Sequence, residues 1–368
     1  MKKIFISILI LLAFNYCAEN VETQKEFKFK TFPAVHKLEG KEVNTLKNLG
    51  FSFIHFEMVD SLLIVKDPYN RNNCLYIVNK NNFELIAKTG KRGKGPREIS
   101  SPGEMFYNPY RKEIWLIDGA KYKTYKFNLK KVLDQDDYLP KPAFKIKEKL
   151  LPFWDIVWLS HNKFAVVNTN NDKLITIYDE KGKKIGDYGK KFHKKKDGDP
   201  LIGYKLTCNA DIDYSKKTKE IFMSFVYFDK IVAINLEQNH QIISEGPKSY
   251  NPEFQYKRGL LSTKKLNRIR GKTIVSNNFV FSTYYGKKKW RLNEKSGPEV
   301  NYFDEIHIFD LKGKPIAKIK LDRQINEFII DNENKRIIAH GVSNDKVVIY
   351  NLQNNNSLEK IINTKQSN

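Results

Sequence analysis

The sequence contains little cysteine and little alanine, and each shortage excludes a class of protein. Its 368 residues include 3 cysteines, with no CxxC pair and no Cys/His cluster, so a zinc site is not predicted. Alanine occurs only 11 times, which disfavours a helical protein. The HExxH and GxSxG signatures and the order of a phosphate-binding loop are also missing, so none of these motifs marks a catalytic centre.

Aromatic and basic residues are abundant instead. The chain has 19 Tyr and 24 Phe, which favour half-buried strands over helices. The formal net charge is +23, which would suit a polyanion such as nucleic acid, an acidic glycan or an anionic membrane. Because lysines recur in nearly every turn and form no single stripe, we interpret the excess mainly as a solvated surface.

The N-terminus has the pattern of a signal peptide. Lys2 and Lys3 precede an apolar run from Ile4 to Phe14, which is too short to span a bilayer but suits the hydrophobic region of a signal peptide. Cys17 follows within three residues and resembles the lipobox cysteine of bacterial lipoproteins, which is diacylated. The resemblance departs at Tyr16 and Phe14, where lipoboxes usually carry a small residue and Leu. We therefore expect residues 1–16 to be a signal peptide and 17–30 a lipidated tether; the alternative is a plain secreted protein.

A strand pair recurs along the rest of the chain. Each copy has a turn and an apolar run, as in "KEIWLID" (112–118), and then an alternating run that ends in Asn or Asp, as in "TYKFN" (124–128). The spacings between these ends are 49, 51, 56, 75 and 41 residues. The six ends, which we call anchors, are Asn79, Asn128, Asp179, Asn235, Asp310 and Asn351.

One further strand precedes each pair and one follows it, so each copy has four strands. Six such copies predict an all-β fold, a six-bladed β-propeller with four-stranded antiparallel blades, over residues 31–368. The ring could close through "SLEKII" (357–362) or through residues 36–48, and the sequence does not choose between them. Cys74 and Cys208 could form a disulfide or remain as two buried thiols.

The stretch "GKRGKGPREISSPGEM" (90–105) lies between the outer strand of the first copy and the inner strand of the second. It is similar to the G-x-G-P-G-E-F linker of NHL-like and TolB-like six-bladed propeller lipoproteins of Gram-negative bacteria. Arg97 and Glu98 stand where that family has Gly-Glu, and Ile99 replaces Phe. The resemblance implies an exported outer-membrane lipoprotein, facing the periplasm or the exterior. It implies little about activity, because a propeller is a scaffold.

The connections of such a propeller divide between two faces. Short turns join the first strand to the second and the third to the outer one, and they define what we call the short-turn face. The long connections, 91–103, 190–208, 246–270 and 284–304, belong to the opposite, long-loop face, where we expect a protein or anionic glycan to bind. The candidate contact residues are basic or aromatic: Lys191, Phe192, Lys194, Tyr204, Tyr256, Lys287, Trp290 and Arg291.

The favoured interpretation is a non-catalytic monomer without a cofactor. Its contact with the membrane is through the lipid anchor only, and nucleic acid is not an expected partner of an exported protein. The alternative is a metal-dependent hydrolase similar to gluconolactonase-type propellers, with a divalent cation such as calcium in the axial channel. Its candidate ligands are polar residues near the starts of inner strands: Glu57, Glu104, Asp155, Asn209 and Asp211.

Overall fold

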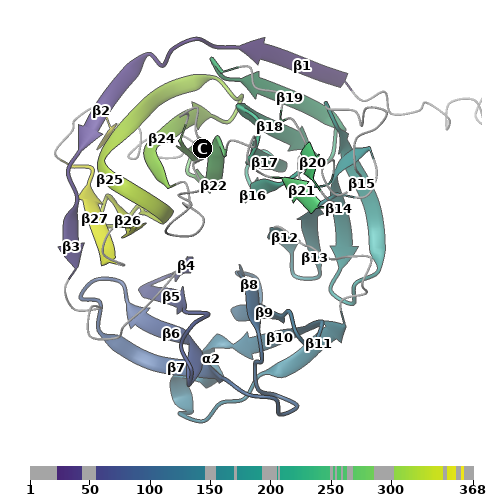
Figure 1. The fold of residues 1–368 in the computed structure, drawn as a ribbon, viewed down its shortest axis with the longest axis vertical. Helices are drawn as coiled ribbons and strands as arrows, with labels where there is room; N and C mark the ends of the chain where they lie inside the picture. Colours follow the sequence, from purple (N-terminus) through teal and green to yellow (C-terminus); the bar gives the residue numbers. More distant parts are fainter. Residues whose placement is uncertain are drawn as a thin grey trace, which may run out of the picture.

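The protein is a β-propeller, with its sheets arranged radially around a central axis (Figure 1). This is a computed structural model. No helix of the described residues is long and apolar enough to span a membrane. The structure describes residues 23–43, 55–145, 155–169, 172–192, 205, 208–248, 252, 255–257, 260–262, 268–285, 302–342, 346–353 and 358–359.

Three sheets have four antiparallel strands that follow one another along the chain, and a fourth sheet adds a fifth strand to this plan. The first sheet has β4 (His55–Val59), β5 (Leu62–Lys66), β6 (Asn73–Asn79) and β7 (Leu85–Lys91). The second has β8 (Pro102–Asn108), β9 (Glu113–Asp118), β10 (Lys123–Asn128) and β11 (Lys141–Lys145), with helix α2 (Leu129–Asp134) before β11. The third has β12 (Ile156–Ser160), β13 (Lys163–Val167), β14 (Lys173–Asp179) and β15 (Lys184–Lys190). The fourth has β16 (Ala210–Ser215), β17 (Glu220–Phe225), β18 (Lys230–Asn235), β19 (His240–Glu245) and β1 (Thr23–Lys28).

The remaining part of the ring is one eight-stranded sheet with a long shared strand, β25 (Pro315–Asp331). The first part of β25 pairs with β24, and the second part pairs with β26. A hairpin of β20 (Gln255–Lys257) and β21 (Leu260–Ser262) lies in the connection from β19 to this sheet. The other strands of the sheet are β22 (Arg270–Ser276), β23 (Phe279–Tyr284), β24 (Phe303–Asp310), β26 (Arg336–Gly341), β27 (Lys346–Asn351), β2 (Ala34–Leu38) and β3 (Lys41–Val43). The predicted propeller of four-stranded antiparallel blades is confirmed.

The anchors mark the ends of the third strands because their side chains begin the next turn. Each side-chain oxygen accepts a hydrogen bond from a backbone N–H two or three residues further on, which fixes an Asx turn. The pairs are Asn79 with Asn81, Asn128 with Lys131, Asp179 with Lys181, Asn235 with Glu237, Asp310 with Lys312, and Asn351 with Gln353.

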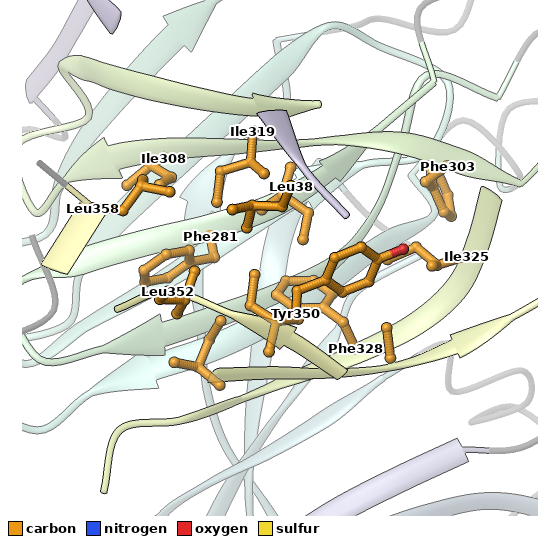
Figure 2. Packing of buried hydrophobic residues seen from close by; sticks show 14 of the residues in the cluster. Leu38, Phe281, Phe303, Ile308, Ile319, Ile325, Phe328, Tyr350, Leu352 and Leu358 are labelled. Atoms are coloured by element: carbon orange, nitrogen blue, oxygen red, sulfur yellow. The ribbon is translucent and has the colours of Figure 1, made fainter. Parts of the chain in front are cut away.

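An N-terminal strap runs around the outside of the ring (purple in Figure 1). β1 pairs in parallel with β19, β2 pairs in parallel with β25, and β3 pairs antiparallel with β27. Phe29 and Phe32 pack edge-on against Phe309, each with a ring-centroid distance of 5.6 Å. Leu38 lies in the largest apolar cluster, beside Phe328 and Tyr350 (Figure 2). The strap therefore contributes to the core as well as to the sheets.

The strap corrects one prediction and decides two open questions. Residues 23–28 of the predicted tether form strand β1, because the Lys/Phe alternation of "KEFKFK" suits an outer strand as well as a polar linker. The ring closes through the N-terminal segment: β3, within the proposed range 36–48, is the outermost strand beside β27, whereas Leu358 and Glu359 are helical. Cys74 and Cys208 are free, buried thiols.

The short turns form one continuous face. Nε of Arg111 donates to the His161 carbonyl over 2.8 Å, which links the second sheet to the third. Nζ of Lys217 donates to Oδ1 of Asn278 over 2.9 Å, which links the fourth sheet to the eight-stranded one. The Asn334 amide donates to Oδ1 of Asn81 over 3.0 Å and completes the link to the first sheet. These contacts place the turns at one end of the axis.

Candidate functional site

Charged side chains gather on the inner strands around the axis. Nδ1 of His55 lies 3.2 Å from Oε1 of Glu327, and Nε2 lies 3.7 Å from Oε1 of Glu57. Nζ of Lys272 lies 3.5 Å from Oε1 of Glu327 and 3.9 Å from Oδ2 of Asp211. Strands β4, β16, β22 and β25 therefore each contribute to one network of opposite charges.

The aspartates of this network also join neighbouring inner strands. The backbone N–H of Ile212 donates to Asp155 over 2.8 Å, and that of Thr273 donates to Asp211 over 2.5 Å. The N–H of Val275 likewise donates to Asp213 over 2.7 Å. An innermost strand has an unpaired edge, so these carboxylates satisfy backbone donors that would otherwise lack a partner. Their arrangement is explained by the architecture without a ligand.

Burial changes the acidity of these groups. It raises the pKa of Asp213 to about 6 and, together with Glu327, the pKa of Asp211 to about 7, against the pull of Lys272. Burial lowers the pKa of His55, but the charge of Glu327 outweighs it and raises that pKa to about 9. His55 is therefore protonated at neutral pH and balances one carboxylate.

A funnel at the axis opens on the short-turn face. Its volume is about 430 Å³, and Glu57, Asp213 and Lys272 form part of its wall. Its rim is formed by residues from the short turns of several sheets: Pro109, Lys216, Asn277 and Asn332. Each of these three charged wall groups has a protein partner: Asp213 accepts a backbone N–H, Lys272 lies beside Glu327, and Glu57 lies 3.7 Å from His55.

The predicted metal ligands meet only in part. Burial and the charge of the nearby Asp211 raise the pKa of Asp155, and Glu57 lines the same channel as Asp155. Glu104 is instead 3.6 Å from Nζ of Lys66, and Asn209 is buried. Among the described residues, no group of three or more His, Cys, Asp or Glu side chains could hold a metal ion. Four residues of the site were not predicted from the sequence: His55, Asp213, Lys272 and Glu327. The D-x-D pattern of "ADIDYS" is the available signal for Asp213.

The glycine-rich connection between β7 and β8 is architectural. Arg92 donates to the Pro68 and Ser100 carbonyls, and Arg97 donates to the Pro140 carbonyl over 2.9 Å. Nζ of Lys121 donates to the carbonyls of Gly95 and Glu98 over 2.7 and 2.6 Å. The guanidinium groups thus bind backbone carbonyls of the protein, and Lys94 is an exposed basic side chain of this loop.

The structure describes only some of the predicted contact residues of the long-loop face. Lys191 is buried, and the half-buried Phe192 packs edge-on against Phe225 and Phe228, so both side chains contribute to packing. Tyr256 lies in β20, and its side chain is outside what the structure describes. The other predicted contacts are outside the described residues as well: Lys194, Tyr204, Lys287, Trp290 and Arg291.

A buried ion pair lies where the 286–301 insertion leaves the eight-stranded sheet. Nη2 of Arg270 is 2.6 Å from Oδ1 of Asp229, and both side chains are fully buried. The Tyr284 hydroxyl donates to Oδ2 of Asp229 over 3.1 Å, and its ring stacks on His307. Burial lowers the pKa of His307 to about 4, so this imidazole is neutral at physiological pH. This buried cluster holds together the strand ends from which the long-loop face begins.

Comparisons with known proteins agree with this fold. A solved structure from the DUF4221 family of Bacteroides vulgatus has a TM-score of 0.51 at 10% identity and covers 82% of this chain and 91% of its own. A Bacteroides fragilis protein described as exported has a TM-score of 0.51 at 14% identity and covers 89% and 99%. No curated protein matches the sequence. The profile of the TolB-like 6-blade propeller-like family matches residues 36–333, and the chain belongs to that family.

Proposed function

We propose that this protein is an exported, lipid-anchored propeller that binds a protein or an anionic glycan through its long-loop face without catalysis. We count six blades. β25 changes partner from β24 to β26 along its length, so the eight-stranded sheet divides into two blades of four core strands. Together with the other four sheets this gives the number that describes the family.

Export and anchoring are supported by the N-terminal sequence. The charged and apolar segments of residues 1–16 direct secretion, and Cys17 would carry the lipid. The similar fold of a Bacteroides fragilis protein described as exported agrees with secretion. Mass spectrometry of the N-terminal peptide should find acyl chains on Cys17, and Cys17→Ser should move the protein to the soluble fraction. An unmodified Cys17 would contradict the anchor.

The observation that carries the binding role is the difference between the two faces. The short turns bind one another and are closed by Asx bonds. The connections that hold the β20–β21 hairpin and the 286–301 insertion begin and end at the opposite end of the strands, above the buried Arg270–Asp229 pair. A rigid scaffold with long loops at one end is a common arrangement for recognition.

The test removes one loop. A variant in which a short glycine-serine linker replaces residues 287–300 should keep the circular dichroism spectrum and thermal unfolding of the parent. It should lose the cross-linked adducts that the parent forms on intact cells. A matched variant that lengthens the 181–183 turn by the same linker should keep them. Unchanged adducts in the loop variant would place the binding elsewhere.

A second candidate is metal-dependent hydrolysis in the axial funnel. The funnel of about 430 Å³ and the gathering of Glu57, Asp155 and Asp211 favour it. The bonds of both aspartates to backbone N–H groups and the position of Lys272 beside Asp211 favour a structural role instead. Calorimetric titration with calcium decides: binding that disappears in Asp211→Asn supports the funnel site, and no heat of binding excludes it for calcium.

A further inference from the structure

We propose that one arc of the short-turn face docks on the surface of an anionic lipid bilayer. The arc consists of the turns 180–183, 216–219, 236–239 and 311–314, on the third sheet, the fourth sheet and the adjoining part of the eight-stranded sheet. This inference rests on the proposed lipid anchor and goes beyond it, because it assigns the protein a second membrane contact and an orientation.

The first observation is charge. The four turns contain seven lysines and two acidic residues, Glu180 and Glu237. Glu180 is already paired with Arg111 at 2.5 Å. The side chains of all seven lysines are exposed: Lys181, Lys183, Lys216, Lys217, Lys219, Lys312 and Lys314. Elsewhere on this face charges cancel, as where Lys80 lies 2.6 Å from Glu333 and where Asp134 ends α2 and two more aspartates follow it.

The second observation is that the turns hold these lysines in fixed positions. Oδ1 of Asp179 accepts the N–H groups of Lys181 and Lys183, and Oδ1 of Asp310 accepts those of Lys312 and Lys314. The glycine between each pair has a positive φ, 80° at Gly182 and 77° at Gly313, which only glycine adopts easily. Within the described residues none of these four ammonium groups forms an ion pair. Their charge is available to an external anion.

The third observation is a groove beside the turn 311–314. Its volume is about 500 Å³. Phe27, Phe29, Ile242 and Pro315 give it apolar surface, and Lys25, Lys28, Lys312 and Lys314 also line it. Lysines that cover apolar surface with their alkyl stems and extend their ammonium groups outward suit the boundary between phospholipid headgroups and acyl chains.

The fourth observation is where the chain enters the ring. β1 begins at Thr23, opposite His240, at the short-turn end of β19 and next to the groove. Cys17 is six positions before Thr23, so the chain can extend no more than about 20 Å between them. A lipid on Cys17 would therefore insert in the membrane close to the lysine-rich arc. Acyl chain and basic residues together are the two signals that hold a protein on an anionic bilayer in one orientation.

The test separates the arc from the anchor. The mature chain beginning at residue 17 and carrying Cys17→Ser, which has neither the apolar signal segment nor a lipid, is sedimented with vesicles of phosphatidylethanolamine alone or mixed with phosphatidylglycerol. We expect binding to the mixed vesicles only, weakened by salt. A quadruple variant of the arc should lose affinity roughly fivefold per lysine. It combines Lys181→Gln, Lys183→Gln, Lys312→Gln and Lys314→Gln. A control variant with the same change in net charge should leave the affinity nearly unchanged. It replaces exposed lysines elsewhere on the protein: Lys37→Gln, Lys41→Gln, Lys88→Gln and Lys94→Gln.

Equal loss in the two quadruple variants would overturn the proposal, since it would show that only net charge matters. Binding to a soluble anionic glycan but not to phosphatidylglycerol vesicles would overturn it as well. A fluorophore on Lys312→Cys provides a readout that needs no quadruple variant: its emission should shift on mixed vesicles, whereas a fluorophore on Lys94→Cys should not respond. Because the protein lacks the lipid, these results do not depend on whether Cys17 is acylated in the cell.

Discussion

At the scale of single residues, a buried cation and a buried carboxylate of this protein are paired with each other. Arg270 and Asp229 are fully buried and meet at 2.6 Å, and Tyr284 donates to the same carboxylate. Removing one member of such a pair leaves the other charge in an apolar environment, which costs more than the pair itself contributes. The cluster is therefore a sensitive point of the join between the fourth and eight-stranded sheets.

We predict that Asp229→Asn lowers the free energy of unfolding by about 3 to 5 kcal/mol. Urea denaturation followed by tryptophan fluorescence measures this change. Lys184→Gln is the matched control, because its pair with Asp187 is half exposed, and it should cost less than about 1 kcal/mol. Similar losses of unfolding free energy in the two variants would show that the buried pair contributes no more to stability than the half-exposed pair.

The axial carboxyl Asp213 should give stability a specific dependence on pH. Its folded pKa of about 6 exceeds its ordinary value of 3.8, so the folded state keeps a proton that the unfolded state releases. The unfolding free energy therefore falls as pH rises from about 4 to about 6. Asp213→Asn removes this titration. Because the side chain is partly exposed, we expect the wild type to lose roughly 1 to 2 kcal/mol more than the variant across that range. Parallel pH profiles would contradict the raised pKa.

At the scale of elements, the N-terminal strap closes the ring. β3 covers the edge of β27, and Glu42 binds Arg323 at 2.9 Å and also Lys346. β1 and β2 cover the outer edges of the fourth and the eight-stranded sheets. The free edges of sheets pair readily with other chains, so their coverage protects the propeller from association.

A truncation series tests the strap. A chain beginning at residue 23 should unfold like the mature protein, because every strand is kept. A chain beginning at residue 44 loses β1, β2 and β3, and should unfold at a lower temperature and form aggregates detectable by light scattering. The missing contacts of Phe29, Phe32 and Leu38 account for the loss. Equal unfolding temperatures for the two chains would mean that the strap is not part of the folded core.

The sequence contains enough local information for the blades but not for the axis. The anchors Asn79 and Asp310 repeat a turn whose bonds span two residues, so their pattern is visible in the sequence. His55 and Glu327 meet only because the ring brings the first inner strand beside the last, and no local pattern encodes that contact. The sequence of β1 suits a polar tether equally well, because an outermost strand with alternating lysines does not differ from a polar linker in composition.

At the scale of the whole molecule, the two faces have different constructions. One end of the axis has interlocked short turns, the funnel and the lysine-rich arc, and the N-terminal strap begins there. The other end has the long connections. An anchor at Cys17 and the lysine-rich arc would together direct the long-loop face away from the bilayer, where a protein or glycan can reach it. The proposed functions of the two faces therefore depend on one orientation.

Site-specific photo-cross-linking in intact cells tests this orientation most directly, with one probe at Lys94 on the long-loop face and one at Lys312 on the lysine-rich arc. The account predicts that Lys94 yields discrete adducts with a protein or glycan and that Lys312 yields adducts with phospholipid. Phospholipid adducts at Lys94, with protein or glycan adducts at Lys312, would contradict it.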